Sequence, residues 1–305
     1  MHPVQNIQFS AIDIIADHYE GILLDAYGVF WGGNACGALP GAIEVMKRLV
    51  ERNKIVGILS NTTALPHKEI DKLAKHEIRQ NEHFHFFLTS GLVARQMFQQ
   101  EILPFPTPKG HYWLFGGVHP QFPNHLPIFE NSRYREAESI QDADFIYLAV
   151  PHIQGQDQTD PELFREAIRA VIPYKLPMFC SNPDQFAHEG NPPRLVVRQG
   201  SIAALYTEMG GKVFYVGKPD VKVFEAAMKE FSHHNVIDKK KVIMIGDNPE
   251  TDIRGANVFG IDSALVLETG MMHERAKAGS MQELIGRLPQ DDQPNYFLRS
   301  LSHVI

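Results

Sequence analysis

Two short apolar runs, far apart in the chain, each end on an aspartate, and this repeated pattern constrains the fold more than any other feature. The first run, Gly21–Leu24, is followed by Asp25, and the second, Val242–Gly246, is followed by Asp247. A short continuous apolar run predicts a strand buried on both faces, as in a parallel sheet covered by helices. Both carboxylates would then lie at the carboxyl ends of strands, where open α/β sheets bind ligands.

The rest of the chain alternates between strand-like and helix-like patterns. Apolar runs predict strands at 55–59, 86–89, 213–217 and 263–267. Residues at helical spacing predict a helix with Ser10 as its N-cap, helices that begin near Pro40 and Pro219, and a helix at 250–258. This alternation predicts an α/β fold with a doubly wound, Rossmann-like parallel sheet. We expect the tail from Gln290 to be loosely held.

A second α/β unit is predicted inside the first. The proline-rich stretch 104–108 indicates a linker, and beyond it the pattern predicts strands at 111–115, 145–150 and 178–181 and a helix at 161–172. We therefore predict a core formed by 1–93 and 194–305, with an inserted domain at 94–193. The polar segment 151–159 lacks periodicity and is expected to be a loop.

Candidate ligand-binding residues follow the predicted strands. Asp252 comes five residues after Asp247, and three converging carboxylates would repel one another unless a cation lay between them. Magnesium prefers such oxygen ligands. Ser60 and Asn61 follow one strand and Lys218 follows another, where a hydroxyl, backbone N–H groups and an ammonium can bind phosphate.

In this order the residues resemble the four motifs of the haloacid-dehalogenase-like hydrolase superfamily, and the match spans most of the chain. The motifs read Asp25-Ala-Tyr-Gly-Val, Leu59-Ser60-Asn61, Gly217-Lys218-Pro219 and Gly246-Asp247-Asn-Pro-Glu-Thr-Asp252. The inserted domain resembles the large α/β cap of the branch, subfamily IIA, that contains para-nitrophenylphosphatases and pyridoxal-phosphate phosphatases. Asn182 and Asp184 match the Asn-Pro-Asp turn of that cap, so we expect them to contribute to the substrate site.

The resemblance implies a magnesium-dependent hydrolase of a small phosphorylated metabolite. Asp25 would attack phosphorus to form an aspartyl-phosphate, while Ser60, Asn61 and Lys218 would bind the phosphate. Magnesium would be held by Asp25, Asp247, Asp252 and the backbone carbonyl of Tyr27. Caps of this type often pair in relatives, which suggests a homodimer through the cap. The sequence does not identify the substrate.

Tyr27 departs from the family pattern, which has a second Asp at this position in phosphatases. That Asp protonates the leaving alkoxide and later activates water, whereas a tyrosine can donate a proton but is a poor base at neutral pH. We therefore expect slow turnover or activity restricted to good leaving groups.

Two alternatives remain open because of Tyr27. One is a catalytically silenced protein that only binds a phosphorylated ligand. The other is a haloacid dehalogenase, since the metal-independent dehalogenases also read Asp-x-Tyr-Gly in their first motif. The large cap and the complete pair of Asp247 and Asp252 argue against dehalogenation.

Composition restricts the partners and the compartment. The 305 residues carry a formal net charge of -7, which gives no support for binding nucleic acid. Two cysteines cannot form a disulfide framework, and we find neither a secretory leader nor an apolar stretch of membrane-spanning length. We therefore expect a cytoplasmic protein that does not associate with membranes.

His83 and His85 could share one face of a strand, but the sequence offers no further metal ligand near them, so we interpret both as structural.

Overall fold

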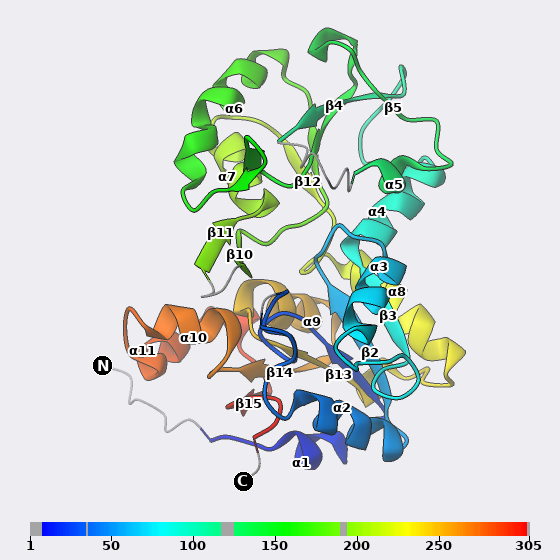
Figure 1. Ribbon diagram of the computed structural model, residues 1–305, viewed down its shortest axis with the longest axis vertical. Helices are drawn as coiled ribbons and strands as arrows, with labels where there is room; N and C mark the ends of the chain where they lie inside the picture. The colour runs from blue at the N-terminus through cyan, green and yellow to red at the C-terminus, as the bar shows by residue number, and fades with distance from the viewer. Residues whose placement is uncertain (1–7, 35, 117–124, 190–193, 304–305) are drawn as a thin grey trace. The chain divides into compact units, whose positions relative to one another are not determined.

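The computed structural model describes residues 8–34, 36–116, 125–189 and 194–303. The chain divides into two compact units (Figure 1). The first unit comprises Met1–Ser60, His67–Leu88 and Lys218–Ile305, and the second comprises Asn61–Pro66 and Thr89–Gly217. Each unit has its own sheet and its own apolar core.

The first unit is built on a six-stranded sheet with the order β15-β14-β13-β1-β2-β3, and the recorded pairings from β15 to β2 are parallel. Its strands are β1 (Gly21–Leu24), β2 (Ile55–Ser60), β3 (Phe86–Thr89), β13 (Val242–Gly246), β14 (Asp262–Val266) and β15 (Tyr296–Leu298). Its helices are α1 (Ile12–Ala16), α2 (Ala42–Glu51), α3 (Pro66–Ala74), α8 (Val221–His233), α9 (Arg254–Phe259), α10 (Gly270–Ala276) and α11 (Met281–Gly286).

Successive residues of a strand point to opposite faces of the sheet, and helices pack on both faces. Ile22 and Leu24 of β1 belong to the same buried cluster as Val45 and Leu49 of α2. Gly21 points to the other face, where a Cβ atom would lie 2.8 Å from the ring of Phe231 on α8. The predicted doubly wound α/β fold is confirmed.

The second unit contains a parallel sheet with the order β12-β9-β6-β4-β5. Aromatic residues from α4, α5 and the sheet pack together on one face, and aliphatic residues meet α6 and α7 on the other. The strands are β4 (His111–Phe115), β5 (Arg135–Glu136), β6 (Phe145–Leu148), β9 (Met178–Cys180) and β12 (Val213–Tyr215), and two hairpins are formed by β7 (His152–Ile153) with β8 (Gln156–Asp157) and by β10 (Phe186–Glu189) with β11 (Arg194–Val197). The helices are α4 (Ser90–Gln99), α5 (Leu126–Phe129), α6 (Arg165–Val171) and α7 (Gln199–Glu208).

The limits of the second unit differ from the predicted 94 and 193. It includes α7 and β12, which the sequence pattern assigns to the core, because β12 pairs with β9. An apolar run indicates a buried strand but does not say which parallel sheet the strand joins. The segment Asn61–Pro66, directly after Ser60, also packs with the second unit.

Three local expectations were wrong. Segment 151–159 was predicted to be a loop but contains the β7–β8 hairpin, whose turn has Gln154 and Gly155 at positive φ. Its strands are too short to show the alternation of polar and apolar residues that predicts a strand. The tail beyond Gln290 is anchored, because β15 pairs with β14 and Asp292 is buried. Ser10 does not cap the first helix, which begins at Ile12 after Ala11.

Among the residues that the structure describes, no helix is both long enough and apolar enough to cross a membrane.

Candidate active site

Three aspartates from different parts of the chain meet at the carboxyl edge of the first sheet. Asp25 follows β1 and Asp247 follows β13, which are neighbouring strands, and Asp252 lies in the π-helix Pro249–Ile253 just beyond β13. One carboxylate oxygen from each lies within 4.8 Å of the other two. All three aspartate residues are buried, with 1% to 9% of the residue surface exposed.

Lys218 bridges two of these carboxylates. Its Nζ donates to Asp25 Oδ1 at 2.5 Å and to the backbone oxygen of Leu59 at 2.9 Å. It also lies 2.7 Å from Asp252 Oδ1, a contact at ion-pair distance that lacks hydrogen-bond alignment. The lysine side chain is only 2% exposed, so its charge is compensated by these carboxylates rather than by solvent.

Asp247 is enclosed by two glycines and a backbone donor. A Cβ atom on Gly28 would lie 2.2 Å from Asp247 Oδ2, and one on Gly270 would lie 1.8 Å from the same oxygen. Met271, the second residue of α10, donates its backbone N–H to Oδ2 at 2.6 Å. Both glycines have positive φ, a conformation that glycine adopts without steric cost.

Asp252 is oriented by the backbone that precedes it. Its Oδ2 accepts N–H groups from Asp247 at 3.1 Å and Asn248 at 3.0 Å. The turn begins with the Asn248 side chain, which accepts the N–H of Glu250 as an N-cap. The two carboxylates of this motif are therefore joined through one short stretch of backbone.

The electrostatics of the cluster favour a divalent cation. Burial, together with the charges of Asp25 and Asp252, raises the pKa of Asp247 well above its usual range. With all groups ionised, the three carboxylates and the Lys218 ammonium leave two negative charges in excess. A divalent cation neutralises this excess, and carboxylate oxygens are ligands that magnesium prefers.

Ser60 ends β2, the other neighbour of β1. It is 3% exposed and directly follows Leu59, whose carbonyl oxygen accepts the Lys218 hydrogen bond. The predicted phosphate-binding hydroxyl therefore belongs to the strand end that also positions the lysine.

Tyr27 lies in the loop after β1, and its hydroxyl oxygen accepts a hydrogen bond from Lys72 Nζ at 3.2 Å. Lys72, on α3, also pairs with Glu69 and lies 5.4 Å from the centre of the Tyr27 ring. Burial lowers the pKa of Lys72, but Tyr27 and Glu69 outweigh this effect and raise it above its usual value. The tyrosine therefore faces a charged ammonium at neutral pH.

The remaining predicted residues lie in the second unit. Asn61 donates its amide to Asp184 Oδ1 at 2.9 Å, and the Asp184 N–H is accepted by Asn182 Oδ1 at 3.0 Å. These bonds fix the Asn-Pro-Asp turn against the segment that follows β2, which gives all three residues a structural role within this unit.

His83 and His85 each accept a hydrogen bond from the backbone. His83 Nδ1 accepts the N–H of Arg79, and His85 Nδ1 accepts the N–H of Val56. Among the described residues, the three aspartates are the only group of three or more that could hold a metal ion. The structural interpretation of His83 and His85 agrees with these contacts.

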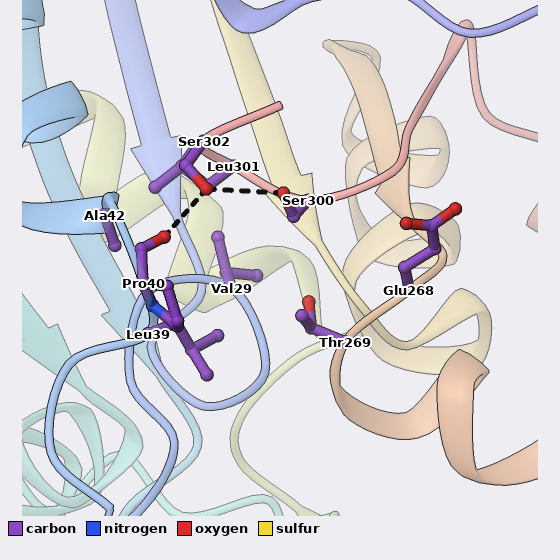
Figure 2. A pocket seen from close by; sticks show the side chains of 9 residues that line it. All are labelled: Val29, Leu39, Pro40, Ala42, Glu268, Thr269, Ser300, Leu301 and Ser302. Carbon is purple, nitrogen blue, oxygen red and sulfur yellow. Dashed lines mark hydrogen bonds between the residues drawn. The ribbon is translucent and has the colours of Figure 1, made fainter. Parts of the chain in front are cut away.

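A small pocket of about 220 Å³ lies next to Glu268 and Thr269, which directly precede α10 (Figure 2). Figure 2 shows the Ser302 hydroxyl bonded to the carbonyl oxygen of Pro40, with Ser300 beside it. None of the three aspartates lines this pocket. Thr269, which does line it, donates its hydroxyl to the carbonyl oxygen of Gly28.

Sequence reasoning missed four participants in the site: Lys72, Glu69, Gly270 and Met271. The Glu69 and Lys72 pair has the i,i+3 spacing of ordinary surface ion pairs, and Met271 acts only through its backbone. The one available signal was Gly270, because a glycine at the start of a helix that follows a strand can indicate close backbone approach.

Two family models match the chain. Residues 22–119 match "Haloacid dehalogenase-like hydrolase", and residues 215–303 match "HAD-hydrolase-like". Together they include Asp25, Ser60, Lys218, Asp247 and Asp252.

Relatives and solved structures agree with these matches. Chronophin from Bos taurus is 24% identical over 99% of this chain and 97% of its own length. Glycerol-3-phosphate phosphatase from Gallus gallus is 25% identical and covers 94% of this chain and 91% of its own. A haloacid dehalogenase-like hydrolase from Brucella suis superposes with a TM-score of 0.77 at 22% identity, over 96% of this chain and all of that chain, which shows a shared fold.

Proposed function

This chain belongs to the haloacid-dehalogenase-like hydrolase superfamily, and from that premise we propose that it is a magnesium-dependent phosphatase that hydrolyses a small phosphorylated metabolite through Asp25. The convergence of Asp25, Asp247 and Asp252 with Lys218 carries this proposal. It combines a nucleophile, a cation site and an ammonium in one buried cluster.

Asp25, Asp247, Asp252 and the backbone carbonyl of Tyr27 would hold the magnesium ion. When bound, the ion would neutralise the negative charge of the phosphate and of the attacking carboxylate. The excess negative charge supports this assignment, because buried carboxylates are costly without a cation. The raised pKa of Asp247 is a consequence of the same burial and repulsion.

In the first step, a carboxylate oxygen of Asp25 attacks phosphorus and the bond to the leaving oxygen breaks. The Lys218 ammonium favours the ionised form of Asp25 and, with Ser60 and the backbone at Asn61, binds phosphoryl oxygens. In the second step, water attacks phosphorus in the aspartyl-phosphate, which releases inorganic phosphate and regenerates Asp25. The leaving oxygen must gain a proton in the first step, and the water must lose one in the second.

Tyr27 is the proposed proton donor to the leaving oxygen, and the resulting phenolate is the proposed acceptor of the proton that the water loses in the second step. The Lys72 ammonium, 3.2 Å from the tyrosine oxygen, stabilises the charge that this oxygen gains when the proton leaves. Nevertheless, a phenol is a weaker acid than the usual carboxyl group. We therefore expect slow turnover, or turnover restricted to esters whose leaving group needs little protonation.

The test is release of phosphate from an activated aryl phosphate, with and without magnesium. We expect turnover that requires magnesium and is abolished by Asp25→Asn. The matched control is Asp71→Asn, which removes an exposed carboxylate on α3 and is expected to leave the rate unchanged.

Three other outcomes contradict the proposal. Binding of magnesium and a phosphorylated ligand without turnover of any ester in a broad panel identifies a catalytically silenced binder. Halide release from a 2-haloacid that is insensitive to chelator identifies a dehalogenase. Turnover that survives Asp25→Asn excludes Asp25 as the nucleophile.

Three further assignments belong to the proposal. The name of the Gallus gallus relative, glycerol-3-phosphate phosphatase, supports a small phosphorylated substrate. A homodimer through the second unit and a cytoplasmic location are proposed with it. Sedimentation of the purified chain tests the homodimer.

A further inference from the structure

The π-helix that carries Asp252 is held by an ion pair on each side. Glu250 precedes Asp252 by two residues and pairs with Arg275, while Arg254 follows Asp252 by two residues and pairs with Asp292. Each pair is bidentate, with two N–H donors on one carboxylate. Bidentate pairs fix the orientation of both side chains as well as attracting them.

The pair of Arg254 and Asp292 is a structural anchor. Its distances are 2.7 and 2.8 Å, and the Asp292 carboxylate is 1% exposed. Removing the arginine would leave a buried charge without its partner, which is strongly destabilising. This side of the turn is therefore fixed by the fold itself.

The pair of Arg275 and Glu250 has a different environment. Its distances are 2.8 and 2.6 Å, but the side chains are 33% and 43% exposed. A solvent-accessible pair of this kind contributes little to the stability of a fold. Its contribution to the fold is small, so its effect on the neighbouring site can be measured separately.

Helix α10 contacts the acidic motif at two points. At its start, Met271 donates its N–H to Asp247 Oδ2, and one turn later Arg275 binds Glu250. Glu250 lies between Asp247 and Asp252 in the chain. The helix is therefore attached to this stretch at Asp247 and at Glu250, two residues before Asp252.

We propose that the ion pair of Arg275 and Glu250 is a positioning clamp that sets the spacing of Asp247 and Asp252, and with it the affinity of the acidic cluster for its divalent cation. The inference rests on the proposed function. Arg275 acts through Glu250 and is a positioning residue rather than a catalytic one. Residues that orient metal ligands commonly change metal affinity by about 10–100-fold when they are replaced.

The test is the dissociation constant of Mg²⁺ for the Arg275→Lys variant, measured by calorimetry on the full chain. Lysine keeps the positive charge but cannot form the bidentate hydrogen bonds of arginine. A change in Mg²⁺ affinity would therefore report the geometry of the pair rather than its charge. We expect about tenfold weaker binding, with the melting temperature of the metal-free protein unchanged. The matched control is Arg299→Lys, because Arg299 pairs with Glu268 at similar exposure and does not contact the acidic motif. Its Mg²⁺ affinity is expected to stay at the wild-type value.

A double-mutant cycle with Glu250→Gln separates the clamp from a general electrostatic effect. If Arg275 and Glu250 act as one unit, the second substitution adds no further loss: the double variant binds Mg²⁺ as tightly as the single variant with the lower Mg²⁺ affinity. Wild-type affinity in Arg275→Lys, or strictly additive effects in the cycle, would overturn the inference. Failure of the wild-type chain to bind Mg²⁺ would instead contradict the proposed function.

Discussion

Tyr27 is the proposed proton donor, and in this role it would set how fast a phosphate ester is hydrolysed. Its side chain is held by Lys72, which is itself held by Glu69, so the phenol is fixed in place by an ion pair on α3. The aspartates, the lysine and Ser60 complete a phosphatase motif without it. The kinetic consequence of this single residue can therefore be isolated.

Replacing Tyr27 with Asp is expected to raise the turnover of an alkyl phosphate by about a hundredfold or more, because a carboxyl group serves both as acid and as base. The measurement is kcat for an alkyl and an aryl phosphate, with the larger gain on the alkyl ester. The Mg²⁺ dissociation constant is the control, since the proposed contact to the ion is the backbone carbonyl. No gain on either ester would indicate a different reaction.

At the scale of elements, the start of α10 is as important to the site as the strands. Gly270 begins this helix and brings its backbone against Asp247, so that Met271 can donate its N–H. The predicted helix at 250–258 is divided into a π-helix and α9, and the π-helix turns Asp252 toward the preceding backbone. Neither feature has a strong local sequence signal.

Replacing Gly270 with Ala is expected to abolish Mg²⁺ binding, because the added methyl group would lie 1.8 Å from Asp247 Oδ2. The matched control is Gly210→Ala, which also has positive φ but has no atom within 4 Å of the added methyl group. The control should lose about 1 kcal/mol of stability from backbone strain and keep its Mg²⁺ affinity. Calorimetry and thermal melting distinguish the two variants, and intact Mg²⁺ binding by Gly270→Ala would contradict the close packing.

At the scale of the whole molecule, the buried acidic cluster couples stability to pH. The pKa of Asp247 is higher in the folded chain than its usual value of 3.8, because of burial and the charges of Asp25 and Asp252. The folded state therefore binds a proton more tightly than the unfolded state does. By linkage, this group makes the metal-free protein less stable as pH rises from about 3.8 to the folded pKa.

Thermal melting in chelator at a series of pH values tests this coupling. The melting temperature of wild type minus that of Asp247→Asn is expected to fall as pH rises above 3.8, since the amide does not titrate. Saturating Mg²⁺ should reverse the trend for wild type, because the ion requires the ionised carboxylate. A difference that is independent of pH in chelator would show that Asp247 is not perturbed.

The division into two units also belongs to this scale. The sequence indicated an inserted α/β unit from the proline-rich stretch and the later strands, and the second compact unit continues to Gly217, beyond the predicted limit of 193. The run Val213–Tyr215 is apolar enough for either sheet, and pairing with β9 assigns it to the second unit. The sheet that this strand joins depends on which sheet has an unpaired edge within reach. Local composition does not record that.

The sequence by itself determined where Asp25, Ser60 and Asp247 lie. Each follows an apolar run, and the carboxyl ends of neighbouring parallel strands share one edge of a sheet. Only the tertiary structure decided that Lys72 faces Tyr27, that Gly270 encloses Asp247 and that Arg275 holds the turn of Asp252. These contacts join elements through side-chain reach and close backbone packing, whereas a hydrophobic pattern records only which residues are buried.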